Sequence, residues 1–467
     1  MEFTNESIHQ IVINQRRYFN TGETLPISFR IQMLKKLKEA FLAYEERIAK
    51  ALYDDLGKDY LESYLCEIGS VLIEINESLH HLKKWGKPKT VRSGLMCFPS
   101  KKTKIYRTPY GVSLIVSPFN FPIYLTLGVL VAAISGGNTA VIKASSKSAN
   151  CTKVMQDMIN EYFDPKYITV IDGGHDIADY CLNERFDKIF YTGSPKVGVH
   201  VLECAAKNLT PTALELGGEN GNWCIIRKDA NLKDAARKVA FFKILNSGQI
   251  CININQVAVA KEVSDEFVKL LKEEFIRQIG EDATKNDEYS KMISKSAYKY
   301  CLEEANQYKD RIVYGGFGDE ESLKISPTII YPVNIDEPIV NHELFNPIIP
   351  IVTYEDDKVN DLLDIISNRE HGLALYVFTK NIKWANKVMR TLQYGGGCIN
   401  EVCVHMMVKG VPFNGTGHSG MGAYRGEWGF REFTHPQTVL FGRTHLNLSL
   451  REHPYGGKNE KKKLKMI

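Results

Sequence analysis

The 467-residue sequence lacks paired cysteines, a secretion signal and any apolar run long enough to cross a membrane. Its ten cysteines include no C-x-x-C pair, which argues against a disulfide framework and against a zinc site. The opening residues, MEFTNESIHQIVINQRRYF, carry acidic side chains and no apolar signal core. The longest apolar run, LTLGVLVAAI at 125–134, is too short to span a bilayer. These absences predict a cytoplasmic protein without a stable membrane anchor.

Charge is also close to balance. The sequence holds 59 Lys and Arg against 55 Asp and Glu, a formal net charge of +4. Such a mild excess gives no reason to expect a nucleic-acid partner. The only concentrated charge is KNEKKKLK at 458–465, within a basic tail at 451–467 that we expect to be a solvated end.

The chain is too long for one compact core, and its patterns change along it. Apolar residues recur every three or four positions over 27–56 and again over 65–85, which predicts amphipathic helices. From about residue 111, short β-rich runs alternate with helical stretches, and a second such series begins near Thr210. This alternation predicts an α/β fold with parallel sheets covered on both faces and ligands at the carboxyl ends of the strands.

The predicted strands of the first series are 111–118, 139–145, 168–173 and 188–193, with a helix over 147–163. Those of the second include ALELG, NWCIIR, QVAVA, 327–333, 348–354 and 373–379, with a helix over 263–279. Residues 101–112 and 436–446 read as further strands, and 412–435 as a glycine-dense loop.

Gly193 and Ser194 lie in KIFYTGSPKVG (188–198), where a predicted strand turns into a helix. Glycine lets the backbone approach a ligand closely, and a helix N-terminus offers free N–H groups to phosphate. The full G-x-G-x-x-G pattern is absent. Taken alone, the stretch is an ordinary strand–turn–helix as often as a cofactor site.

Two further stretches place polar groups in unusual settings. In SPFNFPIY (117–124), two prolines bracket Asn120 and hold the turn rigid, which suits an oxyanion donor. In ALELGGEN (213–220), Glu215 stands in an apolar strand, where desolvation would raise its pKa toward that of a general base. A turn-stabilising asparagine and an exposed strand glutamate are the commoner explanations of such isolated motifs.

Cys251 ends the stretch NSGQIC and is followed by a strand-like run, while HELFNPIIPIV carries Glu343 and Phe345 just before a strand. Together, NSGQIC, LELGG, SPFNFP, YTGSPKVG and HELFNP, at these distances, resemble the aldehyde dehydrogenase superfamily over almost the whole chain. The late segment PFNGTGHSGMGAYRGEWGFREFTH is most similar to the class 3 branch.

The resemblance implies oxidation of an aldehyde to a carboxylic acid with NAD or NADP. Cys251 matches the catalytic nucleophile, which passes through a thiohemiacetal and a thioester. Asn120 matches the side-chain donor of the oxyanion hole, whose second donor would be the backbone N–H of Cys251. Glu215 matches the general base that activates water to hydrolyse the thioester.

Five further residues match the family's cofactor site, and a sixth cofactor-site position, Ser146, departs from it. Lys143, in TAVIKAS, matches the lysine that holds the adenosine ribose, and Gly193 and Ser194 match the turn beside the pyrophosphate. Glu343 and Phe345 match the pair that positions the nicotinamide ribose and ring. Ser146 stands where NAD-preferring relatives often have a glutamate, so we expect NADP to be accepted too.

The sequence also departs from the family pattern. After LELGG it has Glu219-Asn220-Gly221 where Lys-Ser-Pro is usual. Ile244 replaces an aromatic seven residues before the nucleophile, and Asn346 stands where glycine is commoner. None of these changes removes a group that the chemistry requires.

The implied fold is aldehyde dehydrogenase-like: a Rossmann-type NAD(P)-binding domain, an α/β catalytic domain and a small β oligomerisation or bridging element. We assign 1–98 and 113–209 to the cofactor domain, 210–408 to the catalytic domain, and 99–112 with 409–450 to bridging strands and loop. Class 3 relatives are usually dimers, so a homodimer is expected.

Three alternatives remain at this level. A CoA-acylating or acyl-phosphate-reducing relative would pass the thioester to another acceptor, which Glu215 disfavours. A cysteine hydrolase would need a histidine beside Cys251, and none falls in a motif there. A binding protein that lost activity is disfavoured by the joint presence of the catalytic and cofactor residues. Phe119 and Tyr124 suggest a tunnel for medium-chain or aromatic aldehydes, although a core role is equally open.

Overall fold

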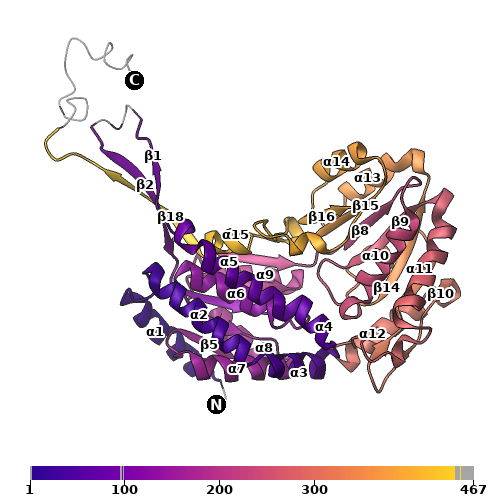
Figure 1. The fold of residues 1–467 in the computed structure, drawn as a ribbon, viewed down its shortest axis with the longest axis horizontal. Coiled ribbons are helices and arrows are strands. Elements are labelled where there is room, and N and C mark those ends of the chain that lie inside the picture. The colour runs from indigo at the N-terminus through magenta and orange to yellow at the C-terminus, as the bar shows by residue number, and fades with distance from the viewer. Residues whose placement is uncertain (1–2, 95–96, 98, 447–452, 454–467) are drawn as a thin grey trace, which may run out of the picture.

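The computed structural model describes residues 3–94, 97, 99–446 and 453, and Figure 1 shows two α/β lobes with a β arm projecting from one of them. The expected parallel sheets are present in both lobes. Within the described ranges, no helix combines the length and the apolar character needed to cross a bilayer. The basic segment 458–465 lies outside the described residues.

Helices form the first part of the chain, as the periodicity predicts. The stretch 27–56 is two helices that meet at Tyr44, and the stretch from 65 begins as a π-helical turn, η1, before it becomes regular. The elements are α1 (Asn5–Asn20), α2 (Ile27–Ala43), α3 (Glu45–Leu56), α4 (Tyr60–Ser63), η1 (Tyr64–Ile68) and α5 (Gly69–Trp85).

The first lobe is built on a six-stranded sheet of order β17-β7-β6-β3-β4-β5, parallel except for β17. Its strands are β3 (Val112–Val116), β4 (Thr139–Lys143), β5 (Ile168–Ile171), β6 (Lys188–Gly193), β7 (Thr212–Leu216) and β17 (Gly420–Met421). Its helices are α6 (Tyr124–Gly136), α7 (Ala149–Tyr162), α8 (His175–Asn183) and α9 (Pro195–Ala206).

Alternate side chains of these strands pack into two different cores, so both faces of the sheet are covered. Leu114 and Val141 belong to a cluster with residues of α1, α8 and α9, while Ile115 and Ile142 join a larger cluster with α2, α6 and α7. One strand differs from expectation. The ALELG run, placed with the second series, is β7, which pairs in parallel with β6 of the first sheet.

The second lobe holds a seven-stranded sheet of order β10-β13-β14-β9-β8-β15-β16, parallel except for β10. Its strands are β8 (Asn222–Ile226), β9 (Ile254–Ala260), β10 (Ile312–Tyr314), β13 (Thr328–Val333), β14 (Ile348–Tyr354), β15 (Ala374–Phe378) and β16 (Gly396–Ile399). Its helices are α10 (Leu232–Ile244), α11 (Ser264–Ile279), α12 (Lys295–Asn306), α13 (Val359–Ser367) and α14 (Ile382–Thr391), with a small hairpin of β11 (Gly318–Asp319) and β12 (Lys324–Ile325).

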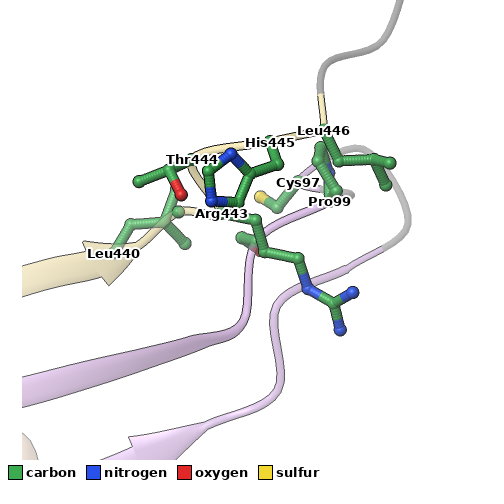
Figure 2. Close-up of a pocket in the computed structure, with 9 residues that line it drawn as sticks. Cys97, Pro99, Leu440, Arg443, Thr444, His445 and Leu446 are labelled. Atoms are coloured by element: carbon green, nitrogen blue, oxygen red, sulfur yellow. The ribbon is translucent and has the colours of Figure 1, made fainter.

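The projecting arm is a three-stranded antiparallel sheet of β1 (Lys89–Val91), β2 (Lys102–Pro109) and β18 (Thr434–Phe441) (Figure 1). The strand expected at 436–446 is β18, which begins at Thr434 and ends at Phe441. The glycine-dense stretch 412–435 is not only loop, because it contains β17 and the short helix α15 (Gly426–Glu432). At the tip of the arm, Cys97 and Pro99 face residues 440–446 across a hollow of about 520 Å³ (Figure 2). None of the predicted site residues lies there.

Candidate functional site

One cavity of about 420 Å³ is lined by all nine residues singled out in the sequence. They are Asn120, Lys143, Ser146, Gly193, Ser194, Glu215, Cys251, Glu343 and Phe345. Six of them follow or end strands β3, β4, β6 and β7, whose carboxyl ends meet at one edge of the first sheet. The other three come from the second lobe. The structure thus brings together residues that lie up to 225 positions apart in the sequence.

Cys251 follows a tight turn whose backbone is left-handed at three successive residues. Asn246, Ser247 and Gly248 have φ of 49°, 50° and 71°. Such conformations are uncommon for residues with a Cβ and are kept only where the surroundings enforce them. The Asn246 Nδ2 donates to the carbonyl oxygen of Gln249 at 3.0 Å, and the Nδ2 of Asn222 donates to that of Cys251 at 2.8 Å. The turn carrying the sulfur is therefore fixed from several sides.

Glu215 is buried at the end of β7, and only 2% of its surface is exposed. Burial raises the pKa of Glu215 to about 7, and the neighbouring Cys251 thiol offsets only part of that rise. Neither carboxylate oxygen makes a hydrogen bond of ordinary geometry within the described part of the chain. A carboxylate in this state can accept a proton near neutral pH. The common alternative, a strand glutamate facing water, is wrong here.

The thiol of Cys251 is held neutral when nothing else occupies the cavity. Burial raises its pKa well above the usual value, and the charges of Glu215 and Glu343 raise it further. Glu343 in turn has its pKa raised to about 8 by burial and by the charge of Glu215. Two carboxyl groups and one thiol therefore share a poorly solvated space, and the order of their pKa values keeps the proton on the sulfur at neutral pH.

Glu343 reaches this space only because Gly217 has no side chain. A Cβ at Gly217 would lie 1.8 Å from the Glu343 Oε1. That Oε1 is buried and has no hydrogen-bond partner among the described residues. The second lobe also contributes Phe345, whose ring meets that of Phe119 edge-on at 5.8 Å between centroids. Tyr124, for which a tunnel role and a core role were both open, is 2% exposed at the start of α6 and packs in the larger core cluster.

Asn120 is buried, and its Nδ2 donates one hydrogen bond to the carbonyl oxygen of Gln249 at 3.0 Å. A primary amide has two N–H groups, so one donor remains for the cavity. The backbone oxygen of Asn120 is held at 2.8 Å by the Nζ of Lys58 and at 3.0 Å by the Nδ2 of Asn246. This side chain has the rigid placement that an oxyanion donor requires.

The other end of the cavity suits the phosphates and ribose of a dinucleotide. Helix α9 begins at Pro195, and its N-cap Ser194 makes no side-chain cap bond, so the first N–H groups are free for an anion. Lys143 Nζ donates to the carbonyls of Ala144 and Gly173 at 2.7 and 2.8 Å, which leaves one N–H for a ribose hydroxyl. Ser146 is exposed at the rim and adds no negative charge. These residues fit a dinucleotide.

The three sequence departures sit outside the reacting centre. Glu219 is exposed and lies 3.0 Å from the Nδ1 of His418. Asn346 donates from its Nδ2 to Glu304 at 2.8 Å. Ile244 is half-buried and packs against apolar core residues. Among the described residues, no group of three or more His, Cys, Asp or Glu is arranged to hold a metal ion.

Sequence reasoning missed the residues that hold the site together. Lys58 and Glu62 lie between the two stretches predicted as helices, and Glu67 was covered only by the general pattern of charges on the second. Lys58 and Glu67 are fully buried, Glu62 is half-buried, and all three contact the catalytic loops. Nothing in the three- and four-residue periodicity marks them as different from surface charges.

Residues 1–439 match the family model described as "Aldehyde dehydrogenase family". The chain belongs to the aldehyde dehydrogenase family. Among curated relatives, the 4,4'-diaponeurosporen-aldehyde dehydrogenase of Staphylococcus aureus is 37% identical over 451 residues, covering 97% of both chains. Aldehyde dehydrogenase family 3 member H1 of Arabidopsis thaliana is 33% identical, covering 97% of this chain and 93% of its own. The "Aldehyde dehydrogenase, dimeric NADP-preferring" of the dog is 35% identical, covering 93% and 94%.

The fold comparison agrees with this membership. The solved structure "Substrate bound state of Staphylococcus Aureus AldH" has a TM-score of 0.95 at 36% identity and covers 100% of both chains. The similarity to family 3 members confirms the class 3 resemblance of the late glycine-dense segment. As a member of the family, the protein is an oxidoreductase that oxidises aldehydes with NAD or NADP.

Proposed function

We propose that the protein converts an aldehyde and water to a carboxylic acid through an acyl group carried on Cys251. The observation that carries the proposal is the single cavity onto which Cys251, Glu215 and Asn120 open together with the dinucleotide-type residues. When bound, the dinucleotide accepts the hydride at C4 of its nicotinamide. All other steps fall to side chains of this chain.

The sulfur of Cys251 forms a bond to the aldehyde carbon, and its proton passes to the carboxylate of Glu215. The Asn120 Nδ2 and the Cys251 backbone N–H donate to the oxyanion that develops on the former carbonyl oxygen. Loss of the hydride from carbon leaves a thioester on Cys251. Glu215, after releasing its proton to solvent, takes a proton from water, which attacks the thioester and frees the acid.

The residues at the cofactor end would bind and orient. Lys143 would hold the adenosine ribose, the N-terminus of α9 after Gly193 and Ser194 the pyrophosphate, and Glu343 with Phe345 the nicotinamide ribose and ring. A Cβ at Gly193 would lie 2.2 Å from the Tyr191 Oη, so the close approach needs glycine. With Ser146 in place of a carboxylate, we propose that both NAD and NADP are accepted.

The test is to trap the acyl group. Wild-type protein incubated with an aldehyde and NAD should show an acyl mass on the peptide that contains Cys251. Cys251→Ala should lose both the adduct and the formation of reduced cofactor while keeping cofactor affinity. Turnover by Cys251→Ala would overturn the assignment of the nucleophile. Adding CoA separates hydrolysis from acyl transfer, because acyl-CoA product would favour the CoA-acylating alternative.

We further propose that the protein is a homodimer in the cytoplasm. The arm of β1, β2 and β18 projects from the body and ends in open strand edges, which favours pairing with a second copy (Figure 1). The dog relative is named as dimeric. All ten cysteines are free, as a reducing compartment requires. Light scattering of the purified chain tests the oligomeric state.

The domain division given above is also a proposal, with the cofactor domain extended through β7 because that strand pairs with β6 of the first sheet.

A further inference from the structure

We propose that Lys58, Glu62 and Glu67 form a positioning cluster that aims both donors of the oxyanion site. The inference rests on the proposed function, since it presumes that Asn120 and the Cys251 N–H stabilise an oxyanion. These three residues touch neither the substrate side of Cys251 nor the dinucleotide end of the cavity. They act through the backbone segments that carry the two donors.

Lys58 is the centre of the cluster. Its side chain is fully buried, and its Nζ donates to Glu67 Oε1 at 2.6 Å and to the backbone oxygen of Asn120 at 2.8 Å. The same Nζ lies 4.0 Å from the centroid of the Phe121 ring. A buried ammonium with these partners fixes the carbonyl of the residue whose side chain is the proposed donor.

Glu67 holds the segment that follows Asn120. Its Oε2 accepts the backbone N–H groups of Ile123 and Tyr124, each at 2.9 Å. Tyr124 is the first residue of α6, and the N-cap Ile123 offers no side-chain acceptor of its own. The charge of Glu67 therefore satisfies free N–H groups at the start of a helix. Residues 120–124 are held at one end by Lys58 and at the other by Glu67.

Glu62 contacts the loop that carries the other donor, the backbone N–H of Cys251. Its Oε1 accepts the backbone N–H of Asn246 at 2.9 Å, and its Oε2 accepts the Ser290 hydroxyl at 3.0 Å. Asn246 opens the left-handed turn that leads to Cys251, and its Nδ2 donates to the backbone oxygens of both Asn120 and Gln249. The two donor loops are thus tied to each other and to the cluster.

The π-helical turn explains how one short segment supplies both carboxylates. Glu62 and Glu67 are five residues apart, so an α-helix would rotate them about 140° away from each other. In η1 the Gly69 N–H bonds to the Tyr64 oxygen, an i to i+5 bond, which brings residues five apart toward one side. A Cβ at position 69 would lie only 2.9 Å from that oxygen, so glycine at this position allows the π-helical turn to form.

A purely stabilising role explains this arrangement poorly. Burying Lys58 and Glu67, with Glu62 half-buried beside them, costs desolvation free energy, and buried ion pairs often stabilise no more than apolar side chains of similar size. Here the side chains of the cluster form hydrogen bonds outside it only to backbone groups of the donor loops and to the Ser290 hydroxyl, among the described residues. An oxyanion site loses rate steeply when its donors move by a few tenths of an ångström.

The test compares Glu67→Gln and Lys58→Met with Lys188→Met. Lys188 is a matched control because it is also buried and paired, with Glu432, yet it lies at the opposite end of β6 from Gly193, roughly 17 Å away. Single-turnover formation of reduced cofactor reports the step that passes through the oxyanion. Alkylation of Cys251 by iodoacetamide passes through no oxyanion, and cofactor Kd reports the rest of the cavity.

We expect Glu67→Gln to slow single-turnover hydride transfer about 10-fold and Lys58→Met about 100-fold. Alkylation rate and cofactor Kd should stay within about threefold of wild type, and Lys188→Met should keep the hydride-transfer rate while lowering Tm. Glu67→Gln keeps an acceptor and the shape of the side chain, so it decides the question if Lys58→Met does not fold.

Two results would overturn the inference: Glu67→Gln as fast as Lys188→Met, or alkylation falling in step with hydride transfer. Failure of the proposed function looks different, because wild-type protein would then give no acyl adduct on Cys251 whatever the cluster variants do.

Discussion

The raised pKa of Glu215 predicts how both catalysis and stability change with pH. With a pKa of about 7, the carboxylate is about half ionised at pH 7 and about one-tenth ionised at pH 6. If Glu215 removes the proton from water, thioester hydrolysis should fall about fivefold over that unit of pH. In Glu215→Gln the Cys251 thiol must lose its proton to solvent instead, so this variant should form reduced cofactor in a slower burst of one per site and then turn over at least 100-fold more slowly than wild type.

The stability effect follows from the same shift. Because the folded pKa lies above the ordinary value of 4.5, protonated Glu215 favours the folded state below pH 4.5. That contribution is lost as the pH rises to about 7, and its size is about 3 kcal/mol. Glu215→Gln cannot ionise, so its free energy of unfolding relative to wild type should rise by about that amount between pH 4.5 and pH 8.

Stopped-flow detection of the burst and urea unfolding at several pH values measure the two effects. Glu219→Gln is the matched control, because Glu219 lies on the same segment but is exposed, and it should change neither profile. A steady-state rate of Glu215→Gln equal to wild type, or a stability difference that does not vary with pH, would refute the reasoning.

Three other substitutions test single contacts. Asn120→Ala should lower the single-turnover rate about 100-fold, equal to about 3 kcal/mol of barrier, and an unchanged rate would remove it from the oxyanion site. Gly217→Ala puts a Cβ where the Glu343 Oε1 lies, so KM for the cofactor should rise about 10-fold or more in initial-rate assays, and an unchanged KM would show that Glu343 does not orient it. Ser146→Glu should raise the Kd of NADP at least 10-fold more than that of NAD, because a carboxylate repels the 2′-phosphate. Fluorescence quenching measures both Kd values, and equal changes would contradict the placement of Ser146 beside the 2′-phosphate.

Strand positions were predictable because buried parallel strands leave a strong signal. The runs at 139–145 and 188–193 became β4 and β6 with only terminal residues trimmed. The sheet to which a strand belongs was harder to predict. The ALELG run follows the first series in the chain and precedes the second, and no local pattern tells whether it pairs with β6 or β8. That pairing is a long-range choice made by packing.

For the site as well, the short motifs could be recognised in the sequence, whereas the long-range contacts between them could not. Cys251, Asn120 and Glu215 stand in short motifs whose proline, glycine or apolar neighbours mark them. Their convergence on one cavity depends on two sheets and could be inferred only from the family resemblance. Burial of Glu215 was also not evident, since a glutamate in a strand more often faces water than the core.

Buried charges that bond to backbone are the hardest group to read from sequence, and Lys58 shows why. Lys58 lies in the short connection between α3 and α4, outside both stretches whose periodicity predicts helices, and a lysine in such a connection is normally solvated. Glu62 lies in α4 and Glu67 in η1, so the change to an i to i+5 bond interrupts the regular 3.6-residue period between the two carboxylates. A periodicity argument assumes constant pitch, and it fails at the point where the protein departs from constant pitch. The period therefore gives no sign that Glu62 and Glu67 both reach backbone groups of the catalytic loops, and π-turns near a candidate nucleophile are a place to look for positioning groups.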